Sequence, residues 1–194
     1  LESHTYGLYA HEQLIGVASL QKMHLTDALN YCLDESRDPT QPNDFYTGLL
    51  FEMENKCHHF AKQHNVDFAD NSVVWVIPEV TILQVSIPKS SRLAILAALM
   101  NALANHLDND NLIITYTEQG SKSLKLLTQK RHGFMPMFVR LWGGTFNMLF
   151  KEVGTFDGRD LKTFSILSGN TRRYKKVVQT AQQLVNLRTR FKIG

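Results

Sequence analysis

Residues 72–134 carry the most regular pattern of apolar and polar positions in the chain. β-branched residues dominate its first part and predict a strand with a bend or bulge at Pro78, because proline has no amide hydrogen to donate. Leucine then recurs at helical spacing, a second β-branched run follows, and a second helical run ends at His132-Gly133-Phe134. The expected strand, helix, strand and helix are residues 73–87, 90–107, 112–117 and 121–130.

Two shorter strand-like runs precede this block. Residues 6–10 and 14–20 are apolar, and the polar His11-Glu12-Gln13 between them gives the spacing of a hairpin. Two helical patterns follow, and the longer one starts near residue 43. Because both lie between the hairpin and the next strand, we expect residues 24–66 to form a helical insertion.

The part after the block is expected to contain three strands and a helix. Residues 135–140 and 145–151 flank Trp142-Gly143-Gly144, which is typical of a hairpin turn. A further strand is expected at 161–167. Asn170 or Thr171 should cap a final helix, since short polar side chains accept hydrogen bonds from the first helical amides.

Charge is distributed unevenly along the chain. Residues 161–194 contain eight basic residues and no Asp or Glu, while the whole chain of 194 residues has a formal charge of only +3. The first 160 residues are therefore acidic overall. We expect an acidic domain at 1–160 and a basic extension at 161–194 packed on it, able to meet a polyanion or an acidic protein.

Composition narrows the class of protein. A hydrophobic content of 43% suits a globular domain, and no apolar run is long enough to suggest a membrane span. The two cysteines, Cys32 and Cys57, form no disulfide framework, so a reducing compartment such as the cytoplasm is expected.

The order of these elements resembles the GNAT family, the N-acetyltransferase fold. The run GLYAHEQLIGVASL is similar to the family's second and third strands, FVRLWGGTFNMLF to its last two, and Gly133-Phe134 to the pair that ends its second cofactor-flanking helix. The resemblance implies an α/β (α+β) fold. Its sheet would be mixed and mainly antiparallel and flanked by helices, with the helical insertion and the basic C-terminal helix added.

The resemblance also implies a function, the transfer of an acyl group, in most cases acetyl, from acyl-CoA to an amine. The base that deprotonates the amine would be Glu79, and Tyr116 is the nearest phenol for the acid. The thioester arm would lie along a splayed strand at Leu83 and Val85. The pyrophosphate would lie at a helix N-terminus, and the residues implied there are Lys89, Ser90, Ser91, Arg92 and Ala94.

Two departures from the family pattern open an alternative. The loop from Ile87 to Arg92 has no glycine. Gln129 stands where the family commonly has a tyrosine that acts as the general acid. The alternative is a GNAT-shaped protein without catalysis, a component of a nucleic-acid or virion assembly. It would bind through the start of its last helix, where the helix dipole disfavours the cations Arg172, Arg173, Lys175 and Lys176.

Cys57-His58-His59 invites a metal site, but the spacing argues against it. Ligands on one helix face must be three or four residues apart, and adjacent residues point about 100° apart. Cys57 falls on the apolar face and is expected in the core. The sequence therefore predicts no metal cofactor.

Overall fold

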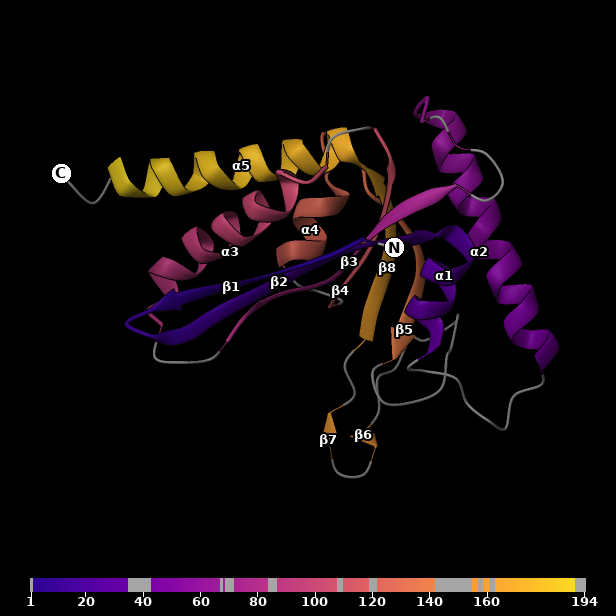
Figure 1. The fold of residues 1–194 in the computed structure, drawn as a ribbon, viewed down its shortest axis with the longest axis horizontal. Helices are drawn as coiled ribbons and strands as arrows, with labels where there is room; N and C mark the ends of the chain where they lie inside the picture. Colours follow the sequence, from indigo (N-terminus) through magenta and orange to yellow (C-terminus); the bar gives the residue numbers. More distant parts are fainter. Residues whose placement is uncertain are drawn as a thin grey trace.

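A six-stranded sheet forms the centre of the molecule (Figure 1). The computed structural model describes residues 2–34, 43–66, 68, 72–83, 87–107, 110–118, 122–141, 155–156, 159–160 and 163–190. The sheet order is β1-β2-β3-β4-β8-β5, and β6 and β7 form a separate two-stranded ribbon. The strands are β1 (Glu2–Ala10), β2 (Gln13–His24), β3 (Val73–Ile82), β4 (Leu112–Glu118), β5 (Met135–Leu141), β6 (Thr155–Phe156), β7 (Arg159–Asp160) and β8 (Thr163–Asn170).

One pair of neighbouring strands in the sheet is parallel. β3 pairs with β4 in parallel, whereas the β1–β2, β2–β3, β4–β8 and β8–β5 pairs are antiparallel. The parallel pair is joined through a helix, as such a connection requires. The predicted fold class, a mixed and mainly antiparallel sheet flanked by helices, is confirmed.

Helices cover both faces of the sheet. On one face α1 and α2 pack over Val74 and Val76, and on the other α3, α4 and α5 pack over Trp75 and Ile77. Because β3 is covered on both faces, its first half is apolar at every position. The helices are α1 (Leu25–Asp34), α2 (Asn43–Gln63), α3 (Lys89–Ala104), α4 (Lys122–Thr128) and α5 (Thr171–Arg190).

The C-terminal helix runs alongside α3. Figure 1 shows α5 running from right to left above α3 and α4 in the view. Asn170 caps it, since its Oδ1 accepts the amide hydrogen of Arg173 at 2.9 Å. The predicted cap is confirmed. Leu184 and Leu187, near the free end, are exposed.

Two sequence predictions are corrected in detail, and a third lies outside the described residues. β3 ends at Ile82 instead of continuing to 87, and its bulge falls where Pro78 was expected to disturb it. α3 starts at Lys89, one residue before the expected start at 90, with Pro88 as its N-cap and no side-chain cap bond. The described partner of β5 is β8, and the predicted partner at 145–151 lies outside the described residues.

The final segment contributes to the same sheet. β8 lies between β4 and β5, so residues 163–170 form an inner strand of the sheet, and α5 is the part of this final segment that packs on a face of the sheet. The boundary at residue 160 stays a prediction. No helix in the described part of the chain is long and apolar enough to cross a membrane.

Candidate functional site

β3 and β4 separate part of the way along their length. They pair in parallel only from Trp75 to Ile77, and the last pair is Ile77 with Thr115. There the Thr115 hydroxyl donates a hydrogen bond to the Ile77 carbonyl oxygen at 3.2 Å. Beyond this point β3 continues only with β2, and β4 only with β8. The sheet therefore opens between its two parallel strands.

A bulge in β3 accompanies the separation. Ser19 pairs with Glu79 and Gln21 with Val76, so Leu20 of β2 faces two residues of β3, one of which is Pro78. A bulge bends its strand and increases the local twist. Proline is tolerated there because the extra residue needs no ladder hydrogen bond. The sequence of β3 thus contributes directly to the opening.

A cavity of about 90 Å³ lies at the opening, on the face covered by α3, α4 and α5. That volume is enough for several water-sized groups, each of which needs roughly 10–15 Å³. Most of its lining is apolar, and the polar lining groups are the hydroxyls of Thr115, Thr117 and Ser123. The apolar lining residues are Ile77, Val80, Leu96, Met100, Leu126, Leu127, Tyr174 and Val177.

One wall of the cavity comes from α5. Tyr174 is almost fully buried, and its hydroxyl donates to the carbonyl oxygen of Met100 at 3.3 Å. Burial raises the pKa of Tyr174 because it disfavours the phenolate, so the side chain stays protonated. Val177 and Val178 follow about one helical turn later, and both are buried as well. The sequence carried no sign that this core position would border a cavity.

The backbone of β3 beside the opening has a defined orientation. The amide of Leu83 donates to the carbonyl oxygen of Ile15 at 3.0 Å, so Leu83 belongs to the β2 side. Because backbone groups alternate along an antiparallel strand, those of Val80 and Ile82 point away from β2, toward β4. Val85, predicted to act with Leu83, lies outside the described residues.

The predicted phosphate-binding residues lie together at the start of α3. Lys89, Ser90, Ser91, Arg92 and Ala94 are all exposed there, in the first two turns. Ser91 also borders a hollow lined by His11 and Gln13 near the β1–β2 turn. The cavity lies on another side of α3, where Leu96 and Met100 face it.

The two predicted catalytic residues lie on the two strands that separate, Glu79 on β3 and Tyr116 on β4. Glu79 is exposed, and it alternates with Val80, so its side chain lies on the face of the sheet opposite the cavity. Tyr116 is in β4, paired with Ile166, but its side chain lies outside the described part of the structure. Glu79 therefore borders the opening from the side of the sheet that does not hold the cavity.

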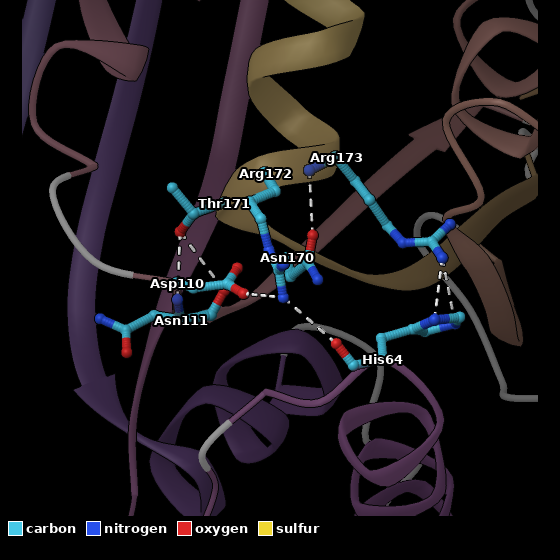
Figure 2. Close-up of polar contacts among 7 residues, drawn as sticks. All are labelled: His64, Asp110, Asn111, Asn170, Thr171, Arg172 and Arg173. Atoms are coloured by element: carbon cyan, nitrogen blue, oxygen red, sulfur yellow. Dashed lines mark hydrogen bonds and ion pairs between the residues drawn. The ribbon is translucent and has the colours of Figure 1, made fainter.

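The four basic residues at the start of α5 differ in their surroundings, and Figure 2 shows the contacts of the two arginines. Arg172 forms an ion pair with Asp110 at 2.5 Å and donates to the carbonyl oxygen of His64. Arg173 donates to the His64 ring at 2.9 Å and to the carbonyl oxygen of His132 at 3.2 Å. Lys175 and Lys176 are exposed. The two arginines thus make contacts within the chain.

Cys57 lies in the core, as the helical pattern predicted. It is fully buried in the cluster beneath α1 and α2, and its thiol lies 3.4 Å from the sulfur of Met137. Burial raises the pKa of the Cys57 thiol, so it stays protonated and is a poor nucleophile.

Comparison with known proteins adds one structural likeness. Neither a protein-family model nor a curated protein sequence matches the chain. Among solved structures, it is similar to the crystal structure of a mosquito arylalkylamine N-acetyltransferase like 5b, with 13% identity and a TM-score of 0.38. The likeness covers 80% of this chain and 69% of that chain. A likeness at this level does not establish a common activity.

Proposed function

We propose that the chain is an N-acyltransferase of the GNAT type, which transfers an acyl group from a CoA thioester to an amine. One observation carries the proposal. The parallel strands part after Ile77 and Thr115, and an apolar cavity lies at the point where they part. Among the described residues, this arrangement offers strand backbone that pairs with no neighbouring strand next to a mostly apolar space, which suits an amide-containing arm that ends in an acyl group.

The thioester arm would bind as an extra strand. Its amide groups can pair with the backbone of Val80 and Ile82, which points into the opening. The acyl group would then enter the cavity beside Val80 and Thr115. Backbone N–H groups at the opening can polarise the thioester carbonyl, and this stabilises the oxyanion that forms when the amine attacks.

The amine would approach from the opposite face of the sheet. Glu79 lies there next to the opening, where a carboxylate can accept the proton that the amine loses. Tyr116, on the neighbouring strand, is the proposed donor of a proton to the departing thiolate. Lys89, Ser90, Ser91 and Arg92 would bind the phosphates, because helix N-terminal amides and cations both attract anions.

A cavity-filling variant tests the proposal. Acetyl-CoA at about 100 times its dissociation constant should stabilise the wild-type chain by ~2.7 kcal/mol. Val80→Trp places an indole in the cavity and should abolish that stabilisation. Leu187→Trp, at an exposed position on α5, should leave it intact. A wild-type chain whose melting temperature does not respond to millimolar acetyl-CoA would contradict the proposal.

The alternative, a non-catalytic protein that binds a polyanion through α5, is distinguished by the same experiment. Under this alternative the melting temperature should not respond to acetyl-CoA. The exposed Lys175 and Lys176 would have to bind the polyanion. Because Arg172 and Arg173 already contact Asp110, His64 and His132, the geometry favours the acyltransferase.

A further inference from the structure

Three potential metal ligands meet at the end of the sheet edge formed by β1. Glu2 and His4 lie on β1, and His106 lies in the turn after α3. One ligand atom of each side chain lies within 4.8 Å of the others. Because the residues come from opposite ends of the first half of the chain, no sequence spacing indicates this cluster.

The side chains are already ordered around one another. Nε2 of His4 lies 2.7 Å from Oε1 of Glu2, and the rings of His4 and His106 stack with centroids 3.9 Å apart. The hydroxyl of Tyr6 hydrogen-bonds Nε2 of His106. The buried Trp75 lies beneath, with its ring 6.4 Å from that of His4. The cluster therefore has an apolar floor and a polar group that orients His106.

The donor set matches the chemistry of zinc. Two imidazoles and one carboxylate are a common three-ligand set for Zn²⁺, which leaves a fourth position open. A hydrogen bond from a ring nitrogen, like that between Tyr6 and His106, is typical of histidines that bind metals.

The three ligands would rearrange locally to form a tetrahedral site. Zinc bonds of about 2.0–2.1 Å place the ligand atoms roughly 3.4 Å apart. Nε2 of His4 and Oε1 of Glu2, now 2.7 Å apart, would move apart to that spacing, and the ligand atom of His106, within 4.8 Å of both, would adjust to it. β1 is an edge strand and the Glu2 side chain is 51% exposed, so Glu2 has room to move, whereas the stacked rings of His4 and His106 must turn to direct a nitrogen at the ion.

One nearby cation must be considered. Lys22 pairs with Glu2 across β1 and β2, and its Nζ lies 5.2 Å above the ring of Trp75. The ammonium is thus directed over the indole. Its charge weakens but does not block a divalent ion that makes direct bonds to three ligands.

We propose that Glu2, His4 and His106 form a Zn²⁺ site that clips the edge strand β1 to the end of α3. β1 otherwise pairs only with β2, so a metal bridging it to His106 adds a cross-link between the sheet edge and the helical layer. The site lies on residues that the proposed acyl transfer does not use.

The test uses the full chain without a polyhistidine tag, stripped with EDTA and exchanged into chelator-free buffer. Titration with ZnCl₂ should show one bound ion per chain and a raised melting temperature. Mg²⁺ should do neither, because it prefers oxygen ligands. His106→Gln and His4→Gln should each weaken Zn²⁺ binding by more than about tenfold, since losing even an outer partner costs that much.

Two controls make the result decisive. His59→Gln removes an exposed histidine on α2 and should leave binding unchanged. Glu2→Gln removes a carboxylate oxygen from a half-exposed side chain without disturbing packing, so a folded variant with weakened binding supports the site even if a histidine variant fails to fold. Absence of Zn²⁺ binding by the wild-type chain, or equal losses in His59→Gln and Glu2→Gln, would overturn the proposal.

Discussion

The guanidinium of Arg173 at the start of α5 donates a hydrogen bond to the imidazole of His64 at the end of α2, over 2.9 Å (Figure 2). The contact joins the two helical layers past the end of the sheet. Arg173 also lies 5.5 Å from the ring centre of Phe60, which packs edge-on against His64. Because the His64 ring accepts a hydrogen bond from the cationic Arg173, a proton on that ring would disfavour the contact. The contact between the two helices is therefore sensitive to pH.

Acidification should weaken the contact between Arg173 and His64. Burial, and then the charge of Arg173, lower the pKa of His64, so the folded chain takes up its proton less readily than the unfolded chain. Stability is therefore lost as the pH falls below about 6.5, the reference value for histidine, toward the lower folded pKa. Urea unfolding at pH 7.5 and 5.5 should show a smaller pH dependence for His64→Gln than for wild type. His59→Gln should show the same pH dependence as wild type. Identical pH dependence in wild type, His64→Gln and His59→Gln would refute the role of His64.

Gly133 should not tolerate a side chain. Its φ is +59°, and a Cβ there would fall 1.5 Å from Nη1 of Arg173. Gly133→Ala should cost at least about 1–2 kcal/mol for the left-handed backbone alone, with the displaced Arg173 adding to that. Gly48→Ala is the matched control in α2, where nothing lies within 4 Å, and should stabilise by about 0.5–1 kcal/mol. The denaturant midpoints of the two variants measure these changes in stability. Equal changes in both variants would contradict the requirement for glycine at position 133.

Gly169 makes room for Phe134. A Cβ on Gly169 in β8 would lie 2.2 Å from the Phe134 ring, which is almost fully buried. Phe134→Ala should cost about 3–5 kcal/mol. Gly169→Ala should destabilise the wild-type chain but add little to Phe134→Ala, because the clashing ring is gone. A double-mutant cycle measures the coupling, and strict additivity would show that the ring does not need this glycine.

Glu79 should matter for turnover and not for cofactor binding. If it accepts the proton of the amine, Glu79→Gln should lower kcat by about 10²–10⁴-fold and leave the affinity for acetyl-CoA unchanged. Asp27→Asn removes an exposed carboxylate from α1 and serves as the control. The readout is release of free CoA thiol with a panel of amines. An unaltered kcat in Glu79→Gln would remove it from the mechanism.

The exposed lysines of α5 should dominate any polyanion binding. Replacing Lys175 and Lys176 together with glutamine should reduce the slope of log K against log salt by about 2. Replacing Arg172 and Arg173 should instead lower the stability of the chain, because both make internal contacts. Filter binding to a single-stranded oligonucleotide over a salt series separates the two. A larger slope change in a folded arginine variant would reverse this assignment.

Local periodicity determined much of the fold in advance. The strand, helix, strand and helix between residues 73 and 130, the first hairpin and the cap at Asn170 all depend on neighbours within a few residues, so their signals lie in the sequence. The burial of Cys57 followed from the same helical pattern.

The tertiary structure alone decided what these elements do together. The hairpin signal at Trp142 could not reveal that β8 would lie between β4 and β5, because strand neighbours are chosen by long-range packing. Nothing local marked Ile77 and Thr115 as the last pair of the parallel strands, or Arg173 as a partner of His64. Sequence periodicity specifies which side of an element is buried, whereas the partner it is buried against depends on how the whole chain closes.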